Sequence, residues 1–448
     1  MQAASRARLR AVLFVVIGVG LVAASGVVLL RDRSSTAGST ASAAPGAASP
    51  SASPATGDAL QRAILTAQAH LRDEPQDWRA WANLGSAYVQ QARITADPSY
   101  YPRAEGALQR SLDLRPAANP DAFVGMGALA SARHDFTAAL DWGKRAQATA
   151  PDTGAVYGVI DDALTQLGRY PEARTALQRM LDLQPSVASF SRASYDLEEH
   201  GDVAGARAAL ERALADATTP ADIAFCRYYL GELAFNSGQL AEAAKQYGIG
   251  RQADPSYFPL LEGVAKVEAA NQQTDAALRD YNELLARVPL PQYVNEVIDY
   301  DQSLGRTREA DSLSKLFQTE SSLFVAGGVD VDLEAAVLDA DHGEPAAAVQ
   351  HAQLEWGRRH SVLVADALAW ALHAAGRDAE ALPYADQALA LGWRNALMSF
   401  HRGVIEQALG MSAAARRDLV AVQDINPYFS TLYAGVAQRA LASLGGRP

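Results

Sequence analysis

Cysteine and lysine are scarce in this sequence of 448 residues. Cys226 is the single cysteine, so an intramolecular disulfide and a cysteine-based zinc site are both excluded. Because Cys226 lies in an apolar stretch with helical periodicity, we expect a buried and unreactive thiol. Most basic residues are arginine, since lysine occurs only at Lys144, Lys245, Lys266 and Lys315.

Positive charge is also in short supply. Residues 1–57 hold five of the 39 basic residues and one of the 51 acidic residues, which leaves 34 basic against 50 acidic residues in the remainder. That remainder therefore has a net charge of −16. Such a surface repels phosphate backbones, so nucleic acid is excluded as a partner.

Motifs for catalysis, cofactors or metals are missing as well. Gly125–Ala130 imitates a dinucleotide-binding glycine motif, but no strand precedes it. Gly327–Glu334 has the acid spacing of a cation loop without the rest of a calcium motif, and we interpret it as a loop before a helix. His342, His351 and His360 are nine residues apart, so one helix would not bring them together. We expect no catalytic residues, no cofactor, no metal and no enzymatic activity.

The N-terminal region contains one long apolar run. Residues 11–30 carry no charge, and twenty helical residues span about 30 Å of hydrocarbon. Three arginines in residues 1–10 precede the run, while two arginines and one aspartate follow it, which predicts a transmembrane anchor with a cytoplasmic N-terminus. The alternative is a signal peptide cleaved near residues 25–43, which would release a secreted protein.

A Ser, Ala and Pro-rich stretch follows at residues 34–57. It contains no charge and no large apolar side chain, so it cannot bury enough surface to offset the entropy of ordering. We predict a disordered linker that separates the membrane from a folded region at residues 58–448.

The folded region is built on a repeat. Residues 168–185 contain a turn at Gly168, an amphipathic helix that begins near Pro171, and a stop at Pro185. An apolar helical pattern lies upstream, so the unit is a helical hairpin. The position five residues after the turn is alanine in ten units, spaced 33 to 38 residues apart: Ala104, Ala139, Ala173, Ala206, Ala243, Ala277, Ala310, Ala348, Ala381 and Ala415.

Two other positions of the repeat agree with this register. The turn carries glycine at Gly168, Gly201, Gly238, Gly305, Gly343, Gly376 and Gly410. Seven residues before the turn position of each repeat, whether or not that position is glycine, small residues predominate: Gly127, Ser194, Gly231, Ala265, Ala336, Ala369 and Gly403. Small residues on facing stripes let two helices approach to about 8–10 Å.

The pattern resembles the tetratricopeptide repeat family, with the closest copy at Trp81, Leu84, Gly85, Tyr88, Ala104 and Pro116. The resemblance implies an all-α, right-handed α-solenoid of about ten helix-turn-helix repeats, here preceded by the transmembrane helix and the linker. Residues 59–74 and 428–444 are expected to be helices that cap the open ends. An insertion at residues 94–103 is interpreted as a recognition loop or as a tolerated surface extension.

The resemblance also implies a concave groove, lined by the first helix of each repeat, that binds an extended peptide or a helix. In the fourth to seventh copies the groove residues would be Tyr195, Glu198, Glu199, Tyr228, Glu232, Phe235, Asn236, Glu262, Lys266, Asn295 and Asp299. This acidic and aromatic strip suits a basic or mixed apolar segment. The alternative is that these residues form ordinary solvated helix faces.

These features predict a non-catalytic protein-interaction scaffold at the cell membrane, with its solenoid outside the cytoplasm. It would bind a protein or peptide partner, for example during assembly of an envelope complex. The alternative is a secreted soluble repeat protein or a small-ligand sensor released by signal cleavage.

Overall fold

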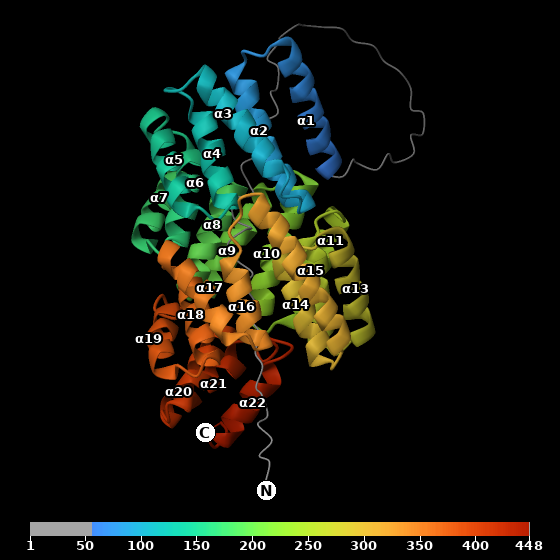
Figure 1. Ribbon diagram of the computed structural model, residues 1–448, viewed down its shortest axis with the longest axis vertical. Helices are drawn as coiled ribbons and strands as arrows, with labels where there is room; N and C mark the ends of the chain where they lie inside the picture. Colours follow the sequence, from blue (N-terminus) through green and yellow to red (C-terminus); the bar gives the residue numbers. More distant parts are fainter. Residues whose placement is uncertain (1–55, 448) are drawn as a thin grey trace.

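The computed structural model describes residues 56–447, and each regular element in that range is an α-helix (Figure 1). The helices are α1 (Thr56–Asp73), α2 (Trp78–Thr95), α3 (Tyr100–Leu114), α4 (Pro120–Ala132), α5 (Phe136–Thr149), α6 (Gly154–Gln166), α7 (Tyr170–Leu183), α8 (Val187–Glu199), α9 (Val203–Asp216), α10 (Pro220–Asn236), α11 (Leu240–Ala253), α12 (Pro259–Ala270), α13 (Thr274–Arg287), α14 (Pro291–Ser303), α15 (Thr307–Ala326), α16 (Asp332–His342), α17 (Pro345–Arg358), α18 (Val362–Ala374), α19 (Asp378–Ala388), α20 (Ala396–Ala408), α21 (Ser412–Ile425) and α22 (Ala434–Ser443).

Local sequence signals set the helix boundaries. The Asp135 carboxylate accepts a hydrogen bond from the Ala138 backbone N–H at 3.0 Å, and Asp202 does the same for Gly205 at 2.8 Å. Both aspartates thereby satisfy a free donor in the first turn of a helix. At the other end, Gly168 has a φ of +76° after α6, a left-handed conformation that favours glycine.

Consecutive helices pair into ten hairpins, from α2 with α3 to α20 with α21. The predicted all-α repeat architecture is therefore confirmed for the described residues. The flanking helices α1 and α22 lie at the ends of the array, as expected. One boundary is corrected: α1 begins at Thr56, so Thr56 and Gly57 are helical and do not belong to the predicted linker.

The structure gives the helix boundaries of the later repeats, which the sequence pattern did not define. Helix α15 runs for 20 residues to Ala326, whereas most second helices of the repeats have 14 residues. Helix α19 continues past Pro383, which lies inside it. Gly125–Ala130 lies within α4 and follows no strand, and Gly327–Val331 forms the predicted loop before α16.

The repeated small residues form the centre of each hairpin. All ten alanines of the repeat are buried, and none exposes more than 3% of its surface. A Cβ atom added to Gly231 would collide with the ring of Tyr247, and one added to Gly127 would lie 2.5 Å from Val159. These approaches are the close helix packing that the pattern predicts.

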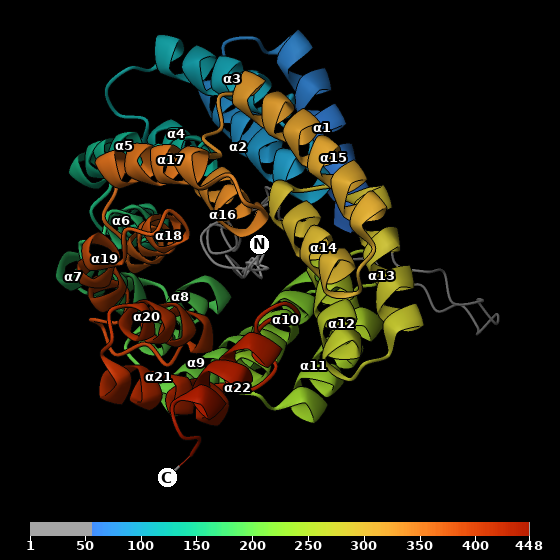
Figure 2. The same cartoon turned by 60° about the horizontal axis from the view of Figure 1, so that its bottom comes forward.

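The hairpins wind into a ring that continues into a second turn. Figure 2 shows α17 to α21 next to α5 to α9, with the first helix of each repeat on the inside. Side-chain hydrogen bonds between the turns join residues 191 to 196 positions apart. For example, the backbone N–H of Val362 donates to the Tyr170 hydroxyl at 2.9 Å. The Asn426 Nδ2 donates to the Phe235 carbonyl at 2.9 Å.

Three turn glycines lie at the contact between the two turns of the ring. A Cβ at Gly168 would collide with the carbonyl oxygen of His360, and a Cβ at Gly201 would lie 2.5 Å from the carbonyl oxygen of Gly392. At Gly238 the nearest atom is the Ile425 carbonyl oxygen at 3.2 Å. We call this contact the turn seam. In the hairpins of the ring's second turn, the glycines that link the two helices have no atom within 4 Å of an added Cβ.

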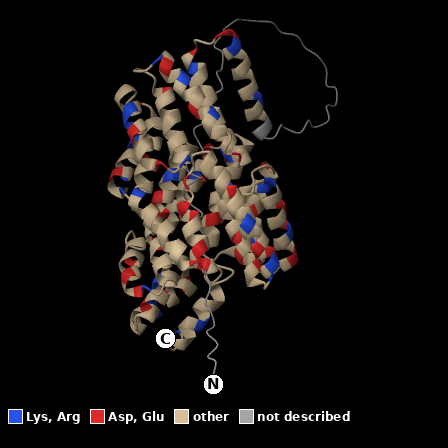
Figure 3. Cartoon of the chain, in the orientation of Figure 1, with Lys and Arg blue, Asp and Glu red and all other residues tan. Residues whose placement is uncertain are grey.

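Between residues 56 and 447, no helix combines the length and the apolar character needed to cross a bilayer. The predicted anchor at residues 11–30 lies outside the described residues, as does nearly all of the predicted linker. Figure 3 shows acidic and basic residues interspersed along the helices in that view, rather than separated onto two sides.

Candidate binding chamber inside the ring

The predicted groove residues come together in space but do not form an open groove. They lie on α8, α10, α12 and α14, the inner helices of four successive repeats. Nine of the eleven are buried: Tyr195, Glu199, Tyr228, Glu232, Phe235, Glu262, Lys266, Asn295 and Asp299. Glu198 and Asn236 are half-buried, and the Asn236 amide donates to Glu198 at 3.2 Å. Their role in binding a partner stays a prediction.

Lys266 holds two carboxylates together within this strip. Its Nζ lies 2.8 Å from both carboxylate oxygens of Glu232 and 2.7 Å from one oxygen of Glu262. The Tyr247 hydroxyl donates to Glu232 at 2.5 Å. Burial lowers the pKa of Lys266, but Glu232 and Glu262 outweigh it and hold that pKa above its usual value. Lys266 therefore stays charged and pairs with Glu232, while burial raises the pKa of Glu262 well above its usual value.

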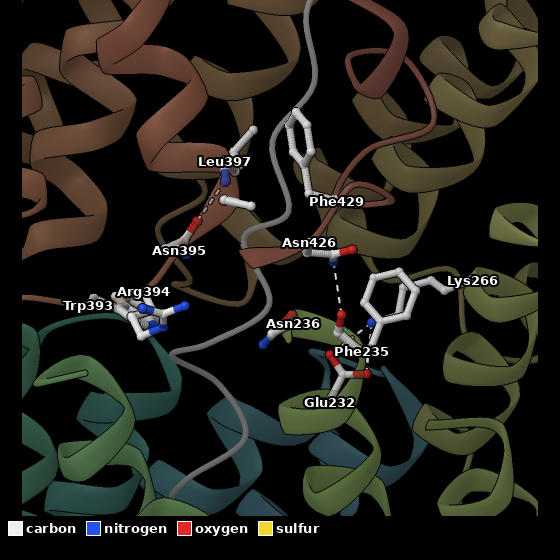
Figure 4. Close-up of a pocket in the computed structure, with 11 residues that line it drawn as sticks. Glu232, Phe235, Asn236, Lys266, Trp393, Arg394, Asn395, Leu397, Asn426 and Phe429 are labelled. Carbon is white, nitrogen blue, oxygen red and sulfur yellow. Dashed lines mark hydrogen bonds and ion pairs between the residues drawn. The ribbon is translucent and has the colours of Figure 1, made fainter. Parts of the chain in front are cut away.

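The end of the strip is covered by the second turn of the ring. Glu232, Phe235, Asn236 and Lys266 line a small cavity, and the opposite wall comes from residues 393–397 together with Asn426 and Phe429 (Figure 4). Its volume is about 40 Å³. That is space for about one water molecule, at roughly 30 Å³ each. The cavity is too small for a peptide in this conformation.

A larger cavity lies inside the ring, where α2, α10, α14 and α16 converge. Its volume is about 240 Å³. We call it the central chamber. Its aromatic lining residues are Tyr101, Phe136, Tyr228, Tyr229, Tyr257, Phe258, Tyr293 and Phe324. Aliphatic side chains fill the spaces between the rings: Ile94, Val288, Leu290, Val329, Val331 and Leu333.

Two helix extensions help to build the chamber. Helix α2 has 18 residues, so its last turn carries Arg93 and Ile94 to the lining. Most of the predicted insertion at 94–103 is thus helical: residues 94 and 95 end α2, residues 100–103 begin α3, and Tyr101 of α3 also lines the chamber. The extended α15 contributes Phe324.

The rings in the chamber wall contact one another. The centroids of Tyr228 and Tyr229 are 5.1 Å apart, and those of Tyr228 and Tyr257 are 6.1 Å apart, both with nearly perpendicular planes. Such edge-to-face pairs are favourable and fix the orientation of the rings. The wall is therefore preformed rather than assembled around a ligand.

Several polar groups of the chamber have no partner within the described part of the chain. They include the hydroxyls of Tyr229, Tyr257 and Tyr293 and the carboxylate of Glu334, whereas the Tyr228 hydroxyl donates to Glu262 at 3.2 Å. Burial raises the pKa of Tyr229, Tyr257 and Tyr293, so these phenols keep their protons at neutral pH and can donate.

Cationic groups also lie in the lining. The Arg359 guanidinium bonds to Glu355 and Gln166 and lies 4.8 Å from the ring centroid of Phe136. Arg93 belongs to the same lining set and comes from α2. Among residues 56–447 no group of three His, Cys, Asp or Glu side chains is arranged to hold a metal ion. An apolar cavity with a few convergent polar groups is typical of a non-covalent binding site.

Comparisons with known proteins found a matching family model and similar solved structures. The tetratricopeptide repeat family model matches residues 191–257. A thermophilic tetratricopeptide repeat protein of Thermus thermophilus is 24% identical with a TM-score of 0.35, over 38% of this chain and 91% of that chain. Human IFIT1, in a dimer with PPP-AAAA, is 12% identical with a TM-score of 0.47, over 82% and 88%.

Pseudomonas aeruginosa pilF is 18% identical with a TM-score of 0.34, over 50% of this chain and 96% of that chain. None of these structural similarities bears on what the protein does. A comparison with curated proteins gave no significant match. The family model thus identifies residues 191–257, which include α9, α10 and α11, as similar to tetratricopeptide repeats.

Proposed function

We propose that this protein is a non-catalytic scaffold that captures a protein partner by receiving a segment of it in the central chamber. Tetratricopeptide repeat proteins are generally protein-interaction scaffolds. The chamber is the observation that carries the proposal, because it combines aromatic walls with hydrogen-bonding groups that have no partner among residues 56–447. A peptide offers both apolar side chains and backbone donors and acceptors to such a site.

The predicted groove residues enter the proposal in a different way. Tyr228 belongs to the chamber wall, whereas Glu232 and Lys266 hold the neighbouring inner helices together. Because their charges are satisfied within the protein, we assign them to the support of the chamber rather than to direct contact with the partner.

The test is site-specific photo-crosslinking in living cells. A benzophenone amino acid replaces Phe258 in the chamber wall, and a matched variant carries it at Tyr428, which is 42% exposed. We expect a discrete crosslinked product from position 258 and little or none from position 428. Equal crosslinking at both positions, or none at position 258, would contradict capture in the chamber.

The proposal also places the protein at the cell membrane, anchored by residues 11–30 with the repeats outside the cytoplasm. Its support is the uncharged run and the arginines before it in the sequence. Protease added to intact cells should then remove the repeats. Protection until the membrane is permeabilised would refute this topology, and a mature N-terminus between residues 25 and 43 would favour the secreted form.

A further inference from the structure

One acceptor in the chamber wall, and a second that lies beside it, lack donors among the described residues. The Glu334 carboxylate makes no hydrogen bond or ion pair within the described chain, and its Oε2 is buried. The neighbouring Asn295 donates through Nδ2 to the Glu334 backbone carbonyl at 3.2 Å, while its own Oδ1 is buried without a partner. Buried acceptors of this kind are rare because each lacks the hydrogen bond that it would make in water. They favour a ligand that brings a donor.

The chamber limits the size and shape of such a ligand. Its volume of about 240 Å³ corresponds to roughly eight water molecules at about 30 Å³ each. This is space for one large side chain and not for a folded element. The ring centroid of Tyr228 lies 5.1 Å from that of Tyr229 and 6.1 Å from that of Tyr257. This arrangement suits a further aromatic ring packed edge to face.

The charges in the lining select among donors. A ligand ammonium group would pair with Glu334, but it would lose its water in a cavity whose lining is mostly aromatic and aliphatic. A ligand carboxylate would face Glu334 itself. A neutral N–H or O–H donor on an aromatic ring avoids both costs and still satisfies the Glu334 carboxylate.

We infer that the central chamber binds a tryptophan or tyrosine side chain of the partner protein, with the indole N–H or phenol O–H donating to Glu334. This inference rests on the proposed function, because it names the side chain that the scaffold recognises. Tryptophan and tyrosine are also the residues that most often anchor protein interfaces, since one end is apolar and the other can hydrogen-bond.

Two pentapeptides test the inference on the full chain. One is acetyl-Gly-Ser-Trp-Ser-Gly-amide, and the other carries 1-methyltryptophan, which has the same ring without the N–H. Titration calorimetry measures their affinities for the wild-type protein, for Glu334→Met and for the matched control Glu344→Met, in which an exposed glutamate outside the chamber is replaced. We expect methylation of the indole to weaken binding about tenfold in wild type and control, and less than about twofold in Glu334→Met.

Several results would overturn the inference. Equal affinities of the two peptides for the wild-type protein would do so without any variant, even if Glu334→Met failed to fold. If the peptides do not compete with crosslinking from position 258, they bind elsewhere and the inference falls. If free N-acetyltryptophanamide binds as tightly as the pentapeptide, a small molecule is the better ligand. If a partner crosslinks at position 258 but the two peptides bind equally well, only the inference is refuted. If no crosslink forms at position 258, the proposed function is refuted as well.

Discussion

At the scale of single residues, the inner face of the ring is rich in carboxylates that burial makes harder to ionise. Burial raises the pKa of Glu198 to about 7, with the Asn236 amide opposing the shift through its hydrogen bond. Burial likewise raises the pKa of Glu199 and Asp299. A carboxylate of this kind binds its proton more tightly in the folded protein than in the unfolded chain.

This shift predicts a pH-dependent stability. For Glu198, the folded-state pKa of about 7 exceeds the ordinary value of 4.5. Its contribution to the free energy of unfolding is therefore fully present below pH 4.5 and is lost as the pH rises through about 7. Glu198→Gln should be less sensitive to pH than wild type between about pH 5 and 8 in urea unfolding. Parallel curves for the two proteins would contradict the assignment.

Single residues also show what the sequence alone could predict. The ten repeated alanines could be predicted from the sequence, because a given position of the hairpin has the same environment in each repeat. That environment does not depend on the curvature of the array. Tyr257 and Phe258 were not predicted, because they lie in a loop between α11 and α12 whose position depends on that curvature. A signal does exist: DPSYYP at residues 97–102 recurs as DPSYFP at 254–259, and both segments contribute rings to the chamber.

At the scale of helices, the hairpins and both capping helices were predicted from the sequence with few errors. The cap α22 completes the last core cluster through Ala437 and Leu441. Tyr433, immediately before α22, is 1% exposed and stacks on Phe400 at 4.7 Å between ring centroids. The end of the array is thus sealed by one aromatic residue and a short helix.

Tyr433→Ala should therefore destabilise the end of the array. We expect the free energy of unfolding to fall by about 3–5 kcal/mol, as for other large core truncations. The effect should be concentrated in neighbouring repeats, because each repeat of a solenoid is stabilised by its contacts with the next. Hydrogen exchange should show faster exchange in α18 to α22 and little change in α4 to α7. Tyr428→Ala is the matched control on an exposed ring. Uniform acceleration along the whole chain would argue against a local cap.

At the scale of the whole molecule, the open concave groove expected from the repeats is replaced by a closed ring. The sequence predicted which helix faces point inward, but it could not show that the array continues for more than one turn and covers its own inner face. That outcome depends on the small rotation between successive hairpins, which accumulates over many repeats. Among the eleven predicted residues, Tyr195 contacts Trp393 of the second turn, and Glu232, Phe235, Asn236 and Lys266 face residues 393–397 of that turn across the small cavity.

The turn seam gives a prediction at this scale. In Gly168→Ala/Gly201→Ala, each new methyl group meets a backbone carbonyl of the second turn. In the matched variant Gly343→Ala/Gly376→Ala, the added atoms meet open space, and only the cost of positive φ remains, about 1–2 kcal/mol at each site. Small-angle scattering should show a larger radius of gyration for the first variant than for the second. Identical values would mean that the seam does not hold the ring closed.

The seam also restricts how this protein can change in length. An open array tolerates the gain or loss of one repeat, because each unit touches only its neighbours. Here residues about 191 to 196 apart must meet, so one repeat of 33 to 38 residues added between them would place every seam contact out of register. The number of repeats between Gly168 and His360 is therefore fixed by closure of the ring, as the number of blades is fixed in a closed propeller.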